Sequence, residues 1–110
     1  MMVGDELTQR TLEAINIKFC ARSRVLANSL DELERNIPYG VDASLSAVLN
    51  CTIGGEGPQP LEAEVIAAAD DASKNAALQL VINQLFKLRD EQVLTGKVSV
   101  VISKLQAIVS

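Results

Sequence analysis

Residues 75–109, NAALQLVINQLFKLRDEQVLTGKVSVVISKLQAIV, form the most apolar stretch of the chain and decide its predicted fold class. Apolar side chains recur there at intervals of three and four residues, a spacing that gathers them on one face of an α-helix. Before a polar gap at residues 89–92, these side chains are Leu78, Val81, Ile82, Leu85 and Leu88. After the gap, they are Leu94, Val98, Val101, Ile102, Leu105, Ile108 and Val109. We therefore expect amphipathic helix on both sides of the gap.

The second half of this stretch contains a glycine, Gly96, and two structures fit it. In one, a single helix of about 35 residues bends near Gly96, which re-aims its apolar face. In the other, a helix ends at Thr95 and Gly96, and residues 97–102, KVSVVI, form a strand because β-branched residues dominate them. We favour the helix, because residues 104–108 keep helical spacing and contain no turn signal.

The composition suits helices packed on one another. The 110 residues are 48% hydrophobic but include only two Phe, one Tyr and no Trp, so the core must be aliphatic. A chain of this length buries about two-thirds of the surface that its unfolded form exposes. We predict one all-α domain over residues 1–110, with a flexible loop at residues 51–60. Its architecture is predicted to be a small helical bundle or a long helical hairpin of two main helices with one or two shorter ones.

A second apolar stripe runs through the N-terminal third and predicts one long helix over residues 7–37, with Asp5 as its N-cap. Part of this stripe repeats every seven residues, at Leu12, Phe19, Leu26 and Leu33. Ser29 and Glu32 have the spacing of a capping box, so a break near Ser29 is the alternative. Residues 38–40, Pro-Tyr-Gly, are expected to end the helix, because proline disfavours helical geometry in the residue before it.

Basic residues gather in the middle of this predicted helix, at Arg10, Lys18, Arg22 and Arg24. The simpler interpretation is a solvated face. A sharper hypothesis is that Lys18, Arg22 and Arg10 pair with an acidic surface on a partner.

Two further helices are expected in the middle of the chain. Asp42 is placed to cap a short helix over residues 43–50, and Pro60 suits the first turn of an Ala-rich helix over residues 61–75. Residues 73–75 are a possible joint between that helix and the C-terminal stripe. Four acidic side chains in this region are interpreted as solvated charge, so that loss of Asp70 should have little effect; they are Glu62, Glu64, Asp70 and Asp71.

Several function classes lack their usual residues. The chain contains no His, the commonest general base and metal ligand, so we expect no enzyme, no cofactor and no metal site. The net charge of −4 and the scarcity of aromatics argue against nucleic-acid binding. Cys20 and Cys51 are interpreted as small buried hydrophobic residues rather than a disulfide. No secretory signal and no membrane span are predicted, so a soluble cytoplasmic location is expected.

These exclusions leave a non-enzymatic interaction or assembly protein as the favoured function. The hypothesis is that the C-terminal helix presents an apolar face to a protein partner or to copies of the same chain in a homo-oligomer. The predicted interface residues are Leu94, Val98, Val101, Ile102, Leu105 and Ile108. The alternative is that shorter helices of the same chain cover this face.

Two other functions stay open. The net acidity and the carboxylates at residues 62–71 fit a small acidic regulator or inhibitor, of the phage or plasmid type, that masks a basic protein surface. The C-terminal third also resembles the C-terminal helix of type III secretion inner-rod and needle subunits, in Leu78-Gln79, Ile82, Val93-Leu94, Lys97 and the terminal residues 104–108. That resemblance implies a small exported helical subunit that polymerises through its C-terminal helix. The two cysteines and the N-terminal heptad stripe depart from the family's pattern.

Overall fold

The computed structural model describes residues 3–49, 60–92 and 97–109, and every regular element within those ranges is helical. The elements are α1 (Val3–Lys18), α2 (Leu26–Asn36), the 3-10 helix η1 (Ile37–Tyr39), α3 (Val41–Leu49), α4 (Pro60–Ala68), α5 (Asp71–Asp90) and α6 (Lys97–Ile108). The prediction of a small all-α bundle is confirmed. The predicted loop at residues 51–60 lies outside the described residues, except for Pro60, which begins α4 as expected.

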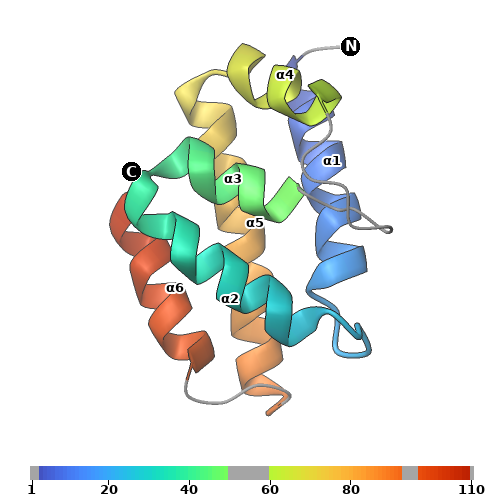
Figure 1. Ribbon diagram of the computed structural model, residues 1–110, viewed down its shortest axis with the longest axis vertical. Coiled ribbons are helices and arrows are strands. Elements are labelled where there is room, and N and C mark those ends of the chain that lie inside the picture. Colours follow the sequence, from blue (N-terminus) through green and yellow to red (C-terminus); the bar gives the residue numbers. More distant parts are fainter. Residues whose placement is uncertain (1–2, 50–59, 93–96, 110) are drawn as a thin grey trace.

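α5 is the central helix of the bundle (Figure 1). α1, α3 and α6 pack against it, α2 lies across α3 and α6, and α4 caps α3 and α1 at one end. The predicted apolar face of α5 forms the centre of the core, because Leu78, Val81, Ile82, Leu85 and Leu88 are all at most 1% exposed. The buried apolar side chains of the described helices belong to one continuous core.

The prediction of a single N-terminal helix is wrong, because the chain leaves helical geometry between Lys18 and Leu26. Polar contacts stabilise this break. The Ser23 hydroxyl donates to the Ile17 carbonyl (2.9 Å) and accepts from the Val25 N–H (3.2 Å), which satisfies one group at the end of α1 and one at the start of α2. Of the heptad residues, Leu12 therefore lies on α1, Phe19 directly after it, and Leu26 and Leu33 on α2. Leu12 is 42% exposed, while the other three are buried.

The helix caps predicted for this region are also wrong. α1 begins at Val3, so Asp5 lies inside the helix rather than before it. α2 begins at Leu26, and Ser29 is a buried residue within it rather than an N-cap. The predicted stop at residues 38–40 is confirmed: η1 contains Pro38, and Gly40 follows it with a φ of 105°, which favours glycine. The next helix starts directly afterwards at Val41, so Asp42 lies in its first turn rather than at its N-cap.

The C-terminal stripe forms two helices, so the single bent helix is wrong, while helix rather than strand at residues 97–102 is confirmed. α5 ends at Asp90, and α6 turns back to lie beside it (Figure 1). A straight helix of 35 residues would be about 52 Å long, whereas the longest dimension of the molecule is 36 Å. Folding the stripe in two lets α5 and α6 cover each other's apolar faces. Gly96, the predicted bend, lies outside the described residues.

The joint between α4 and α5 lies at residues 69–70, not at the predicted residues 73–75. Asp70 is the N-cap of α5, and its carboxylate accepts a hydrogen bond from the Ser73 N–H at 2.8 Å. Hydrogen bonds from Ser73, first from its side chain and then from its backbone, lower the pKa of Asp70 below its ordinary value. Asp70 is solvent-exposed, as interpreted from the sequence, but it also caps α5, a role that the sequence analysis did not predict.

Candidate functional site

The structure buries most of the predicted interface within the same chain. Val98, Val101, Ile102 and Leu105 are at most 2% exposed and belong to the common core, and Ile108 is half-buried against it. Leu94 lies outside the described residues. In this fold, these four buried side chains offer no accessible surface to a partner. An intermolecular role for the face would require α6 to leave the core.

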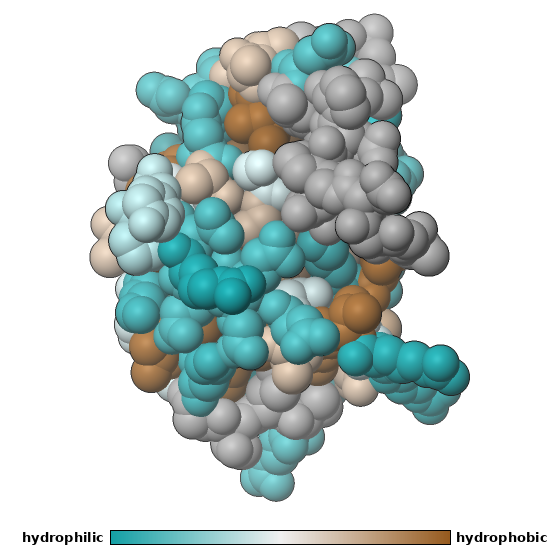
Figure 2. Space-filling model, in the orientation of Figure 1, coloured by the Kyte–Doolittle hydropathy of each residue, from teal (hydrophilic) through white to brown (hydrophobic). Residues whose placement is uncertain are grey.

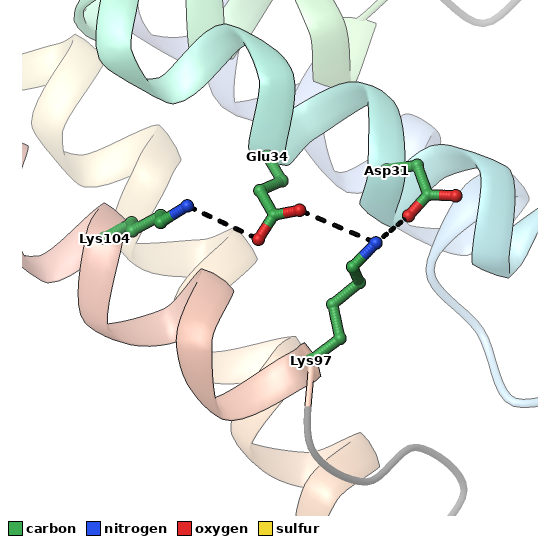
Figure 3. A network of polar contacts seen from close by, with 4 residues as sticks. All are labelled: Asp31, Glu34, Lys97 and Lys104. Atoms are coloured by element: carbon green, nitrogen blue, oxygen red, sulfur yellow. Dashed lines mark hydrogen bonds and ion pairs between the residues drawn. The ribbon is translucent and has the colours of Figure 1, made fainter.

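Lysines on the outer side of α6 are paired with acidic residues of α2 (Figure 3). The Lys97 ammonium contacts the carboxylates of Asp31 and Glu34, the latter at 3.5 Å, and Lys104 contacts the second oxygen of Glu34 at 3.4 Å. The hydrogen bond that Lys97 donates to Asp31 is the main reason that the pKa of Lys97 is raised above its ordinary value. Exposed pairs of this kind contribute little stability individually. These ion pairs nevertheless give both lysines of α6 a carboxylate partner within the same chain.

The N-terminal basic residues do not act as one group. Lys18 is only 6% exposed, and its ammonium donates to the Ala47 carbonyl at 3.0 Å. This carbonyl is among the last four of α3, which lack partners within their helix and carry the negative end of its dipole. The hypothesis that Lys18 pairs with a partner's acidic surface is therefore wrong, because Lys18 caps α3. Arg10 lies 3.9 Å from Glu6 on the same helix.

The exposed turn between α1 and α2 is the strongest candidate for a binding surface, and we call it the corner: Ile17, Cys20, Arg22, Arg24 and Val25. Because both backbones bond the Ser23 hydroxyl, Ile17 and Val25 lie close together although seven residues separate them. Their side chains are 41% and 43% exposed. Cys20 has a free, half-buried thiol.

A second restraint on the corner comes from the centre of the bundle. The Gln84 side chain of α5 donates to the carbonyl of Phe19 at 2.7 Å, and the Phe19 ring is fully buried. The turn is therefore attached to the core at its start and closed by Ser23 in its middle. Such attachments reduce the conformational entropy that the turn would lose on binding a partner.

The two arginines of the corner differ from most other cations of the chain. Arg22 and Arg24 are exposed, and neither forms an ion pair with a described carboxylate. By contrast, Arg89 lies over the Phe86 ring at 4.7 Å, and Lys74 pairs with Asp42 at 2.9 Å. Figure 2 shows apolar and strongly polar side chains next to each other on the right-hand edge of the molecule, at the level of this turn. The corner thus combines exposed apolar surface with unmatched positive charge.

A small open cavity of about 260 Å³ lies where the N-terminal ends of α3 and α5 meet the end of α6. It is lined by Val41, Asp42, Asp71, Lys74, Asn75 and Ile108. The one cation of this lining, Lys74, already pairs with Asp42. Among the residues that the structure describes, no three His, Cys, Asp or Glu side chains gather as metal ligands.

No described helix is both long and apolar enough to cross a lipid bilayer. Comparison with protein-family models, with curated proteins and with solved structures gives no match for the chain.

Reasoning from the sequence missed the corner because it placed residues 17–25 inside a continuous helix. A signal was nevertheless present. Ile17 and Val25 fall outside the heptad positions, so the predicted apolar stripe would not have buried them. Only the break between α1 and α2 brings the backbones of these two residues close to each other, at an exposed turn.

Proposed function

We propose that this chain is a non-enzymatic helical interaction protein that binds another protein through the corner. The observation that carries the proposal is the exposure of Ile17 and Val25 beside two arginines that no described carboxylate matches. This proposal keeps the class of function expected from the sequence and moves the interface from α6 to the α1–α2 turn. The expected cytoplasmic location stays a prediction.

Burial of the remaining apolar surface at the corner supports binding there. Fully burying a side chain such as Ile or Val contributes roughly 1.5–3 kcal/mol. Since each of these two side chains is already more than half buried, a partner gains less than that from each. The corner would therefore serve as part of a modest interface of the transient kind, with the arginines supplying orientation.

Assembly through α6, which the resemblance to type III secretion subunits implies, is the less favoured function. It would expose Val98, Val101, Ile102 and Leu105, which are buried in the folded chain. The acidic-regulator function is also less favoured, because Asp70, one of the four carboxylates that suggested it, is engaged as a helix cap. Both remain predictions.

The proposal is tested by selecting peptides that bind the folded chain from a displayed random-peptide library. We expect a substantial share of the selected peptides to lose binding to the double variant Ile17→Ser with Val25→Ser. The matched control is Val100→Ser on α6, which removes a side chain of similar exposure, 46%, from another part of the surface. If no peptides are selected, or if the corner variant and the control bind them equally, the proposal fails.

The mass of the chain in solution, measured over a wide concentration range, tests self-association separately. A concentration-dependent dimer that persists in the corner variant would contradict the proposed site. The interface would then lie on α6 or on another face of the molecule.

A further inference from the structure

We propose that the corner recognises an acidic protein segment whose carboxylates lie next to apolar side chains, with Arg22 and Arg24 binding the carboxylates and Ile17 and Val25 the apolar groups. This inference rests on the proposed function and adds the chemistry of the partner. Its basis is that two exposed arginines of one turn lack a described carboxylate partner.

The chain as a whole has an excess of acid, with 14 Asp and Glu against 10 Lys and Arg. Five of the ten cations contact a described carboxylate, Lys74, Lys97 and Lys104 among them. Arg22 and Arg24 are exposed without a described acidic neighbour. Charge complementarity therefore indicates that carboxylates for these two side chains come from another molecule.

The residue type fits this chemistry. The planar guanidinium group of arginine binds carboxylates through two parallel hydrogen bonds and is more weakly hydrated than the ammonium of lysine, so it loses less on leaving water. The two arginines flank Ser23, whose hydroxyl ties the turn to Ile17 and Val25. Their backbone positions are thus restrained before binding, in the same turn that carries the exposed Ile17 and Val25.

Other negatively charged partners fit the molecule less well. A nucleic acid or an anionic bilayer presents a continuous negative surface, which the net charge of −4 repels over long range. Two arginines alone attract an anionic membrane only weakly. A short acidic segment confines its charge to the corner, and its apolar side chains use the rest of the site.

The test sequences the peptides selected from the random library by the folded chain and measures their affinities. We expect corner-dependent peptides to be enriched in Asp and Glu adjacent to Leu, Ile or Phe. Their affinity should fall about 30-fold or more in the double variant Arg22→Glu with Arg24→Glu, and should weaken as salt rises from about 50 to about 500 mM. For a single charge reversal, the test variant is Arg24→Glu and its matched control is Arg35→Glu. Arg35 is also exposed but lies at the far end of α2.

The outcomes separate the partner chemistry from the site. Peptides that need Ile17 and Val25 but show no acidic enrichment, or bind the charge-reversed variant equally well, overturn this inference and leave the proposed function standing. Absence of any corner-dependent peptide overturns both. Corner-dependent binding to phosphatidylserine-containing vesicles, or corner-dependent dimerisation, without binding of acidic peptides assigns the site to a membrane or to a second copy and also overturns the inference.

The Cys20 thiol provides an independent measurement at the corner. An acidic peptide bound there should slow alkylation of Cys20 by iodoacetamide, followed by mass spectrometry of the Cys20-containing peptide. The charge-reversed variant should lose this protection. Unchanged alkylation of Cys20 at saturating peptide would place the peptide elsewhere and count against the inference.

Discussion

α6 and the α1–α2 corner carry the same two kinds of side chain in opposite environments. In α6, the apolar residues Val101 and Ile102 are buried, and Lys97 pairs with carboxylates of α2. At the corner, the apolar residues Ile17 and Val25 are partly exposed, and the nearby arginines have no described acidic partner. The difference indicates that α6 stabilises the fold, whereas the corner has surface left for another molecule.

The contrast also shows how apolarity alone misplaces a binding site. The residues of α6 are the more apolar set in the sequence, and the energy of burying them favours covering them within the chain. Two side chains at a turn contribute less to folding, and they stay partly exposed. A less apolar but uncovered surface is therefore the better candidate for an interface.

The largest expected loss of stability comes from a substitution in the buried face of α6. Ile102→Asp places an unpaired carboxylate in the core, and we expect it to cost about 5 kcal/mol or more, comparable to the total stability of many domains of this size. Val100→Asp, two residues away but 46% exposed, should change stability by less than about 0.5 kcal/mol. Chemical denaturation followed by circular dichroism measures both. Similar losses in the two variants would mean that the buried face of α6 is wrongly assigned.

A smaller loss of stability is expected from replacing the buried Lys18, and almost none from replacing the exposed arginines that follow it. Lys18→Met keeps most of the apolar stem but removes the donor to Ala47, so we expect a loss of about 1–2 kcal/mol. Arg22→Met should leave stability within about 0.5 kcal/mol of the wild type. The midpoints of urea denaturation compare the two variants. A loss from Arg22→Met as large as that from Lys18→Met would show that Arg22 has an internal partner.

Asp70 sharpens the comparison, because it is exposed like Arg22 but has a partner within the chain. Asp70→Ala removes the N-cap of α5, and we expect the melting temperature at neutral pH to fall by about 3–6 °C. Since the folded pKa of Asp70 is lowered, its contribution is present above the ordinary value of 3.8 and is lost as the pH falls through the folded pKa. The difference in melting temperature between wild type and Asp70→Asn should therefore shrink between about pH 5 and about pH 2. A constant difference would contradict a role for the carboxylate charge.

The ion pairs between α2 and α6 should have a still smaller effect. Glu34→Gln removes the carboxylate that contacts both Lys97 and Lys104, and we expect the melting temperature to fall by no more than about 2–3 °C. Because pairing raises the pKa of Lys97, its contribution is complete below the ordinary value of 10.5 and is lost as the pH rises through the folded pKa. Thermal denaturation at low and high salt measures the effect, which high salt should reduce. A loss of stability as large as the one expected for Lys18→Met, about 1–2 kcal/mol, would mean that these ion pairs are a main source of the stability of α6.

The smallest expected effect on stability is at the corner. Ile17→Ser with Val25→Ser should change the melting temperature by less than about 2 °C, because both side chains are partly exposed. Differential scanning calorimetry measures this directly. A large loss of stability would mean that the two side chains are needed for folding, and their exposure would then be no argument for binding.

Much of the local structure could be predicted from neighbours in the chain. The spacing of Leu78, Val81 and Leu85 is enough to predict helix and the buried face of α5, because the period of the helix alone selects which side chains share a face. The stop at Pro38 and Gly40 and the start of α4 at Pro60 follow from the restricted backbone of proline and the freedom of glycine. The helical content of the bundle could likewise be predicted from neighbouring residues.

The breaks and the exposed surface were decided by tertiary structure. Residues 19–25 contain no Gly or Pro, and the contacts that hold the turn include the hydrogen bond from Gln84 to Phe19, which spans 65 positions of the sequence. The burial of Ile102 and the capping role of Lys18 likewise depend on helices that are distant in the chain. Periodicity records which side chains share a face, whereas their burial depends on whether another segment packs against that face, and that is known only once all the helices are in place.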